Sequence, residues 1–317
     1  MKYLIVGDTH ATPHNLEEIK ALFKFINEKA IENNLDTIIL LGDLFDTHQI
    51  VNLSVLHTYY DIFKKYHKLD FISLVGNHDR SVHGWNRKEH ALLPYKDIDN
   101  VMIVDDFYDE GNFNLISYCR TEEEFLKFCK KKTSDTLICH QTFDGARYEN
   151  GFYAKDGFDL KKVPYKNIIS GHIHMEHKFD NVFYTGAPRW INRSDANVEK
   201  KIWIWDGKQD FQAIETNSVC QPIYSLDLDE SSEAPTLKSG AKYILNITGN
   251  KKYIHKMYDK YLGKAEIKTN LIDSKNVSVK ESMGINKALE KFINEQYISQ
   301  YGIPKDLLLK EIFTRLL

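Results

Sequence analysis

The chain has 317 residues, of which 42% are hydrophobic, so it can bury a substantial core, and its length suggests about two domains. It carries 42 Lys and Arg against 45 Asp and Glu, and the net charge of -3 excludes a protein that binds nucleic acid through overall positive charge. The apolar stretch at the N-terminus is too short for a signal sequence or a membrane span. We therefore expect a cytoplasmic protein without a membrane association.

The four cysteines, Cys119, Cys129, Cys139 and Cys220, contain no CxxC pair. A chain that can build an ample hydrophobic core does not need disulfides for stability. The cysteines are therefore expected to be free thiols in a reducing compartment.

Short apolar runs rich in β-branched residues recur along the first two thirds of the chain. Their continuous hydrophobicity predicts strands that are buried on both faces. The expected strands are 3–6, 37–41, 71–75, 101–104, 113–117, 136–139, 167–170 and 182–184. Between the first three strands, segments 15–34 and 53–66 show the apolar spacing of helices. Asn15, with Glu18 three residues later, is expected to cap the first of these helices.

The composition changes in the last third of the chain. Residues 229–240 are polar and contain Ser, Pro and Gly, which is typical of a linker. The elements expected after it are a strand at 242–247, a helix at 251–261, strands near 265–271 and 276–280, and helices at about 285–299 and 305–316. The domains predicted from this order are 1–217, a small α+β domain at 218–284, and C-terminal helices at 285–317.

Side chains of metal-ligand type directly follow five of the expected strands. They are Asp8 and His10, Asp43 and Asp46, Asn77 to Asp79, His140, and His172 with His174. Each has an ordinary explanation by itself: an Asp after Gly often forms a turn, a single His often lies in a core, and the two histidines of "GHIH" would share one face of an extended strand. Ligands of α/β sheets bind at the carboxyl ends of strands, however, so the five coincidences together predict a metal centre.

The ligand types narrow the choice of metal. Carboxylates, an amide oxygen and imidazoles without a thiolate suit Mn, Fe, Zn or Mg, and the histidines make Mg alone less natural than Mn. The seven candidate ligands are too many for one ion but fit two ions that share a carboxylate, an arrangement used for displacement at phosphorus. Two divalent ions would contribute about four positive charges and two aspartates would remove two, which leaves a positive crevice that favours phosphate.

The motifs "DTH", "GDLFD", "GNHD", His140 and "GHIH", in this order, resemble the calcineurin-like metallophosphoesterase superfamily over about residues 1–205. The resemblance implies an α/β fold, a β-sandwich flanked by helices, followed here by a small α+β capping domain. It also implies a ligand set: Asp8, His10 and His174 for one metal ion, Asn77, His140 and His172 for the other, and Asp43 as the bridge.

The resemblance further implies two catalytic residues. His78 would meet the phosphate and protonate or stabilise the leaving oxygen, and Asp46 matches the carboxylate that orients this histidine. An alternative for Asp46 is an acidic residue that stabilises a helix N-terminus. Asp79 is expected to cap its loop rather than to contact the substrate.

The motif "GDLFD" and the additional domain resemble the SbcD-type nucleases, the nuclease subunits of SbcC–SbcD complexes, and residues 184–206 resemble recombination endonuclease subunits of phages. The resemblance implies an exonuclease or endonuclease acting in DNA recombination, repair or end processing, in the host cytoplasm if the gene belongs to a phage. Residues 218–284 would position DNA, and the helices of 285–317 would dock an SbcC-like ATPase. A homodimer is also implied.

Several alternatives stay open from the residues alone. The apolar stripes of the last two helices could pack on their own domain. The candidates for contacts with DNA phosphates are Arg80, Arg87, Arg189 and Arg193. The enzyme could instead act on small nucleotides or phosphoproteins, and a scaffold subunit with a vestigial metal site is the alternative outside enzymes.

Overall fold

The computed structural model describes residues 1–46, 50–81 and 87–272. The chain divides into two compact units, Met1–Ser225 with Thr236–Ile244, and Leu226–Pro235 with Leu245–Leu317. The strand expected near 276–280 and the last two helices lie outside the described residues, and the domain boundaries expected at 217 and 284 stay predictions.

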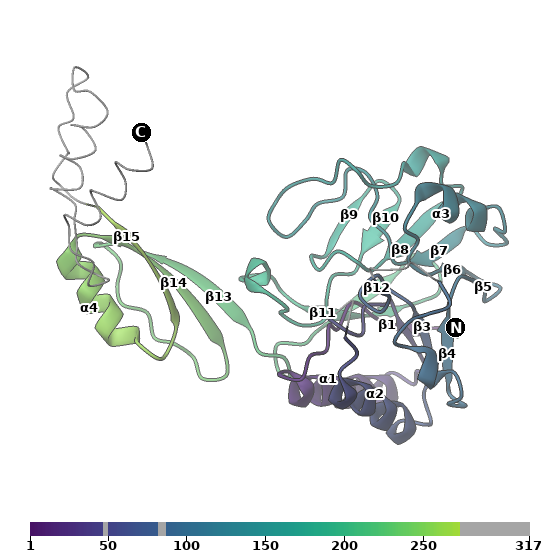
Figure 1. Cartoon of the computed structure of the whole chain (residues 1–317), viewed down its shortest axis with the longest axis horizontal. Helices are drawn as coiled ribbons and strands as arrows, with labels where there is room; N and C mark the ends of the chain where they lie inside the picture. The colour runs from purple at the N-terminus through teal and green to yellow at the C-terminus, as the bar shows by residue number, and fades with distance from the viewer. Residues whose placement is uncertain (47–49, 82–86, 273–317) are drawn as a thin grey trace, which may run out of the picture. The chain divides into compact units, whose positions relative to one another are not determined.

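The first unit contains two six-stranded sheets (Figure 1). The first sheet has the order β12-β11-β1-β2-β3-β4, and its strands are β1 (Tyr3–Val6), β2 (Thr37–Leu40), β3 (Asp70–Leu74), β4 (Val101–Val104), β11 (Lys201–Trp205) and β12 (Phe211–Glu215). The second sheet has the order β5-β6-β7-β8-β10-β9, and its strands are β5 (Phe107–Asp109), β6 (Asn114–Ile116), β7 (Thr136–Cys139), β8 (Asn167–Ser170), β9 (His177–Phe179) and β10 (Val182–Tyr184). All eight expected strands are therefore confirmed.

The central strands of each sheet run parallel. In the first sheet β1, β2, β3 and β4 pair in parallel, and in the second sheet β6, β7, β8 and β10 do so. Parallel neighbours place their carboxyl ends at the same edge of a sheet. The loops that carry the expected ligands therefore leave each sheet at one edge.

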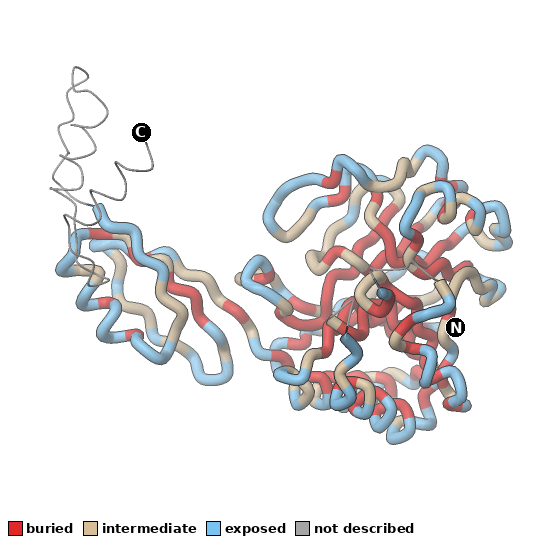
Figure 2. Tube along the Cα trace, viewed as in Figure 1, coloured by how far each residue is buried: buried red, intermediate tan, exposed pale blue. Residues whose placement is uncertain are grey.

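The two sheets pack face to face, and alternate residues of one strand enter different cores. In β1, Tyr3 and Ile5 belong to the core between the sheets, whereas Leu4 and Val6 belong to the core that includes the helices. This alternation explains why the strands are apolar without interruption. Figure 2 shows the resulting buried interior of the first unit in red. The α/β sandwich expected from the resemblance is confirmed.

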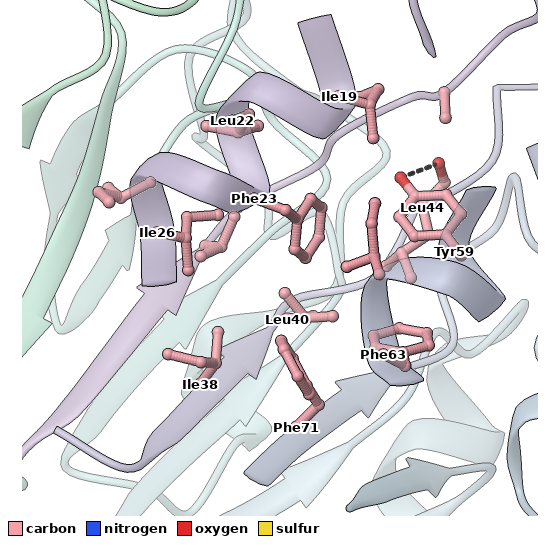
Figure 3. Packing of buried hydrophobic residues seen from close by; sticks show 14 of the residues in the cluster. Ile19, Leu22, Phe23, Ile26, Ile38, Leu40, Leu44, Tyr59, Phe63 and Phe71 are labelled. Atoms are coloured by element: carbon pink, nitrogen blue, oxygen red, sulfur yellow. Dashed lines mark hydrogen bonds between the residues drawn. The ribbon is translucent and has the colours of Figure 1, made fainter. Parts of the chain in front are cut away.

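Helices α1 (Leu16–Glu32) and α2 (Leu53–Lys65) cover the first sheet, and α3 (Glu122–Cys129) packs on the second sheet. Figure 3 shows Phe23 of α1 and Phe63 of α2 against Phe71 of β3. The Tyr59 hydroxyl donates a hydrogen bond to the carbonyl oxygen of Leu44 at 2.9 Å. This bond ties α2 to the loop after β2, which carries Asp43.

The expected cap of the first helix is only partly correct. Asn15 precedes α1, but its side chain makes no capping bond to the helix. It accepts a hydrogen bond from the Thr12 N–H at 2.8 Å and donates one to the His10 carbonyl at 3.0 Å. Asn15 therefore orders the loop that carries His10, because an Asn side chain competes readily for nearby backbone groups.

The last described sheet has the order β13-β14-β15 and is accompanied by one helix. Its elements are β13 (Ile223–Leu228), β14 (Lys242–Gly249), α4 (Lys251–Tyr261) and β15 (Glu266–Leu271). The strands expected at 242–247 and 265–271 and the helix expected at 251–261 are confirmed. The polar segment 229–240 is the connection between β13 and β14.

Two expectations about composition can be compared with the structure. All four cysteines are buried and free. Within the described residues, no helix combines the length and the apolarity that crossing a membrane requires.

Candidate metal centre

Loops from both sheets bring the seven expected ligands together. The first sheet supplies Asp8 after β1, with His10 in the same loop, Asp43 after β2 and Asn77 after β3, and the second supplies His140 after β7 and His172 and His174 after β8. The histidine nitrogens and carboxylate oxygens among them form clusters of a size that a metal ion could occupy. The residues fall into two groups: the Asn77 group (Asn77, His140 and His172) and the His174 group (Asp8, His10 and His174).

The Asn77 group is compact. The Asn77 side-chain oxygen lies 3.0 Å from His140 Nε2 and 2.7 Å from His172 Nδ1, and these two nitrogens are 3.2 Å apart. His140 Nδ1 lies 2.8 Å from the Leu41 carbonyl oxygen. That contact requires a proton on Nδ1, so the Nε2 of a neutral His140 presents its lone pair to the group.

The His174 group is more open. Its histidines face each other with 3.1 Å between His10 Nε2 and His174 Nε2, and Asp8 Oδ2 lies 3.9 Å from His174 Nε2. Asp43 connects the groups, because its Oδ2 lies 3.2 Å from His140 Nε2 and 3.7 Å from His10 Nε2. A single carboxylate oxygen therefore faces both groups.

This donor set fits two divalent cations. An octahedral site with bonds of about 2.1 Å has ligand-to-ligand edges of about 3.0 Å, close to the nitrogen separations of 3.1 Å and 3.2 Å in the two groups. Among the described residues, Asp8 Oδ1 is buried without a hydrogen-bond partner, which a cation would satisfy. We conclude that the residues can hold two ions with Asp43 between them.

Burial and the charges of neighbouring residues raise the pKa of some of these ligands and lower the pKa of others. Burial raises the pKa of Asp8 to about 7. Burial alone would also raise the pKa of Asp43, but the neighbouring His140 and His10 outweigh it and hold that pKa well below its usual range. Burial lowers the pKa of His172 to about 3, and His140 adds to this effect. Neutral His172 therefore offers a lone pair to a cation near neutral pH.

His140 shows the complementary behaviour. Burial opposes its protonation, but the carboxylates of Asp43 and Asp8 raise its pKa to about 9. Burial and the neighbouring His10 lower the pKa of His174 well below its usual range. The carboxylates and imidazoles therefore shift one another's pKa values, as is common at functional sites.

Strained backbone directs three of the expected ligands. His10, Asp43 and His172 have φ angles of 44°, 49° and 79°, in the left-handed region that costs a residue with a side chain about 1–3 kcal/mol. At His172 this conformation prevents the extended geometry expected for "GHIH". The alternative in which His172 and His174 share one face of an extended strand therefore does not hold, and they enter different groups.

The glycine of "GNHD" is required by close packing. A Cβ on Gly76 would lie 2.1 Å from Asp43 Oδ1 and 2.4 Å from the Asp43 nitrogen. Gly42 has a φ of 105°, and a Cβ at this position would lie 2.8 Å from His140 Nδ1. Only glycine lets these strand ends approach closely enough to bring Asp43 and His140 together.

His78 lies at the border of the centre. Its backbone N–H donates to Asp43 Oδ1 at 2.7 Å, and its ring lies at 4.6 Å from the His10 ring, edge to face. Its Nδ1 lies 2.7 Å from the main-chain carbonyl oxygen of Asp46. The Asp46 carboxylate instead lies 3.3 Å from His10 Nδ1. Asp46 thus contacts His78 through its backbone and not through the expected carboxylate, because His10 attracts that carboxylate.

Asp79 caps the loop, as expected. Its carboxylate accepts hydrogen bonds from the Phe45 N–H at 3.0 Å and the Gly76 N–H at 2.9 Å. It thereby joins the loops after β2 and β3.

Three of the four arginines proposed for DNA contacts have internal roles. Arg80 is 1% exposed and donates to the backbone carbonyls of Arg87 and Asp105. Arg87 pairs with the carboxylates of Asp106 and Glu124. Arg189 is also buried and binds Glu18 at 2.8 Å. The expectation of DNA contacts is therefore wrong for these three arginines. A guanidinium has several N–H donors, and here carbonyls and carboxylates of the protein itself accept their hydrogen bonds. Arg193 is exposed and stays a candidate.

Three residues around the centre were not anticipated. Tyr118 stacks on the His172 ring at 5.8 Å. Glu149 Oε1 accepts a hydrogen bond from the His174 N–H at 2.5 Å, and Lys200 Nζ donates one to the His174 carbonyl at 2.8 Å. They follow no ligand motif, so only their contacts reveal them.

Comparison with known proteins agrees with this geometry. Residues 1–176 match the sequence model of the family described as calcineurin-like phosphoesterase. The chain is 25% identical over 335 residues to the DNA double-strand break repair protein Mre11 of Nanoarchaeum equitans (strain Kin4-M), covering 93% of this chain and 90% of that protein. It is 26% identical over 204 residues to the putative phosphoesterase 078R of Invertebrate iridescent virus 3, covering 58% and 56%.

Two solved structures are also similar to the chain. One is GAP50, the anchor in the inner membrane complex of Plasmodium, with a TM-score of 0.40 and 15% identity over 68% of this chain and 88% of that one. The other is the Pseudomonas putida nuclease MPE, with a TM-score of 0.33 and 14% identity over 67% and 87%.

The family model covers more than half of the chain, and its fold and clustered ligands agree with the resemblance seen in the motifs. The chain belongs to the calcineurin-like phosphoesterase family. It is a metal-dependent phosphoesterase that uses divalent ions.

Proposed function

We propose that this chain is a two-metal nuclease that hydrolyses DNA phosphodiester bonds. The observation that carries the proposal is the similarity to a DNA double-strand break repair protein over 93% of this chain, far beyond the matched family domain. The substrate class is inferred from that relative. The chemistry is inferred from the paired ligand groups.

In this proposal each ligand group holds one divalent ion. We take Mn as the preferred ion, because the histidines make Mg alone less suitable than Mn, and Fe or Zn are the alternatives. When bound, the ions lower the pKa of an attacking water and share the charge of the transition state. Asp43 contributes one oxygen that faces both groups and another that accepts the His78 N–H at 2.7 Å. It therefore fixes His78 relative to the ligands.

His78 is proposed to assist departure of the leaving oxygen. Its Nδ1 contacts the Asp46 carbonyl oxygen at 2.7 Å, so Nδ1 carries a proton and Nε2 is the nitrogen that exchanges a proton with substrate. Asp46 is proposed as a positioning residue for His78 through its backbone and for His10 through its carboxylate. General acid catalysis of this kind contributes about 10²–10⁴-fold.

The partners are also part of the proposal. DNA is the substrate, and residues 218–284 help to position it. The segment 285–317, outside the described residues, would dock an SbcC-like ATPase, with which the protein would act as a homodimer in DNA recombination, repair or end processing. We place this activity in the cytoplasm, or in the host cytoplasm for a phage protein.

A second candidate is hydrolysis of small phosphodiesters. It is favoured by the internal roles of Arg80, Arg87 and Arg189, which remove three candidate DNA contacts from the first unit. Under this reading the metal centre is fully active, but on mononucleotide esters rather than on a polymer.

The deciding experiment is digestion of end-labelled duplex and single-stranded DNA by the purified chain with Mn²⁺ and with EDTA. Asp43→Ala serves as the inactive variant, and Asp61→Ala, which changes an exposed aspartate of α2, serves as the matched control. A small phosphodiester is assayed in parallel. We expect Mn²⁺-dependent DNA cleavage that Asp43→Ala abolishes and Asp61→Ala retains.

Rapid hydrolysis of the small phosphodiester without DNA cleavage would contradict the nuclease proposal and support the second candidate. Absence of both activities in a protein that binds Mn²⁺ would favour a scaffold role. Repeating the assay with an SbcC-like ATPase then tests whether the partner supplies access to DNA.

A further inference from the structure

The peptide groups on both sides of His174 are held from opposite directions. Its N–H donates to Glu149 Oε1 at 2.5 Å, and its carbonyl accepts from Lys200 Nζ at 2.8 Å and from the Ala187 N–H at 3.0 Å. A metal-ligating side chain projects from a backbone that must itself be fixed. The contacts of His174 therefore determine where its ring lies.

Lys200 is part of a fully buried ion pair. Lys200 and Asp195 are 1% and 0% exposed, and Lys200 Nζ lies 2.5 Å from Asp195 Oδ1. The other carboxylate oxygen of Asp195 accepts hydrogen bonds from the Ile191 and Asn192 N–H groups, both at 2.9 Å. Taking two charges out of water is costly, so such a pair is a weak source of stability. Its geometry points to a different role.

The pair links the two sheets at the metal centre. Lys200 immediately precedes β11, which pairs antiparallel with β1 in the first sheet, with Ile5 opposite Trp203. Asp8 and His10 follow β1, whereas His174 follows β8 of the second sheet. Lys200 thus extends from the sheet of Asp8 and His10 to the backbone of the histidine that must meet them.

The Lys200 ammonium group also explains a further cluster of ligand-type atoms, which lies beside the metal centre. Glu149, His174 and Asp195 present atoms within 4.8 Å of one another, which by spacing alone resembles a metal group. Lys200 Nζ already contacts Asp195 Oδ1 at 2.5 Å. The lysine supplies positive charge there, and this cluster supports His174 instead of holding another ion.

We propose that Lys200 and Asp195 are positioning residues that set His174 against His10 and Asp8 and thereby determine the affinity of the His174 group for its divalent ion. The inference rests on the proposed role of these ligands. It predicts that loss of the Lys200–Asp195 pair lowers the affinity for the ion of the His174 group and leaves the affinity for the ion of the Asn77 group unchanged.

The test counts bound Mn²⁺ by calorimetric titration of the full chain after dialysis against EDTA. We expect two ions on the unaltered protein. In Lys200→Met the affinity for one ion should fall about 10–100-fold, the range found for residues that support metal ligands, while the other stays unchanged. Lys201→Met is the matched control, because the neighbouring Lys201 pairs with Glu176 and Glu199 rather than with His174.

A second variant separates positioning from the cost of an unpaired buried charge. Lys200→Met combined with Asp195→Leu removes both charges, a change that is often neutral or stabilising for a buried pair. We expect this double variant to unfold at the same temperature as the unaltered protein. Its affinity for the ion of the His174 group should nevertheless be lowered as in Lys200→Met. Wild-type affinity for both ions in the double variant would overturn the inference, and so would unfolding of both variants, which would mark the pair as purely structural.

Kinetics provide an independent readout. With either variant, the Mn²⁺ concentration that gives half-maximal hydrolysis should rise about 10–100-fold, and saturating Mn²⁺ should restore most of the maximal rate. A loss that saturating Mn²⁺ does not restore would contradict the positioning role. Two bound ions without DNA cleavage by the unaltered chain would refute only the proposed substrate, whereas fewer than two would refute this inference as well.

Discussion

The two halves of the metal centre use the same kinds of side chain but differ in how the fold holds them. In the Asn77 group the ligand atoms of Asn77, His140 and His172 lie within 3.2 Å of one another. In the His174 group His10 Nε2 and His174 Nε2 are 3.1 Å apart, but Asp8 Oδ2 is 3.9 Å from His174 Nε2.

The difference lies in what supports each half. His140, which follows β7 of the second sheet, is fixed by the backbone carbonyl of Leu41, which directly follows β2 of the first sheet. The His174 group depends on side chains from elsewhere, with Asp46 beside His10 and Lys200 on the backbone of His174. Ligands supported by strand ends are preorganised, so we expect the Asn77 group to bind its ion more tightly.

The largest effect should come from Asp43→Ala, which removes the carboxylate oxygen that lies near the Nε2 atoms of both His140 and His10. We expect loss of turnover by more than about 10⁴-fold, because both ions lose a ligand and no clamp on phosphorus can form. Mn²⁺-dependent hydrolysis measures the change, with Asp61→Ala as control. Appreciable activity in Asp43→Ala would show that the groups act independently.

A large effect without loss of metal is expected for His78→Gln. His78 touches Asp43 through its backbone N–H, which the substitution retains, so both ions should still bind. The maximal rate should fall about 10²–10⁴-fold because proton transfer to the leaving oxygen is lost. His57→Gln, on the exposed surface of α2, is the control. Weakened Mn²⁺ binding in His78→Gln would place His78 among the ligands instead.

Asn77→Ala tests the compact half directly. It removes the amide oxygen that lies within 3.0 Å of both His140 Nε2 and His172 Nδ1. We expect the affinity for the tighter ion to fall by at least the roughly 10–100-fold seen for supporting residues. Calorimetric titration with Mn²⁺ measures it, with exposed Asn217→Ala as control. If the weaker ion were lost instead, our ranking of the halves would be reversed.

The smallest effect is expected for Asp46→Ala. The backbone contact to His78 survives the substitution, whereas the carboxylate 3.3 Å from His10 Nδ1 disappears. We expect about a tenfold loss of affinity for the ion of the His174 group and little change in the maximal rate at saturating Mn²⁺. If the maximal rate of Asp46→Ala fell as far as that of His78→Gln, the result would contradict this prediction. It would indicate that the Asp46 carboxylate orients His78 after all.

Much of the fold could be predicted from the sequence because its signals are local. Strand-length apolar runs place β1, β2 and β3, and the ligand-type residues that follow them mark the carboxyl edge of a sheet. Short elements such as β5 (Phe107–Asp109) and β9 (His177–Phe179) were missed, because three residues show no period and form only when a neighbouring strand offers hydrogen bonds.

The partners of charged side chains could not be predicted in the same way. Arg189 meets Glu18 across 171 positions of sequence, and Lys200 meets the backbone of His174 across 26. No spacing rule links such residues, because their proximity depends on how the sheets pack. For the same reason the Asp46 carboxylate was assigned to His78, although the fold places it beside His10.

The sequence by itself determined the strands, the residue types at their ends and the metallophosphoesterase family, since these depend on local periodicity and on motifs read in order. The resemblance carried by the motifs already implied how the ligands divide between two ions. Only the tertiary structure decided which side chains support each group. That support depends on left-handed backbone at His10, Asp43 and His172 and on contacts between two sheets. Both arise from packing in three dimensions, which no local pattern encodes.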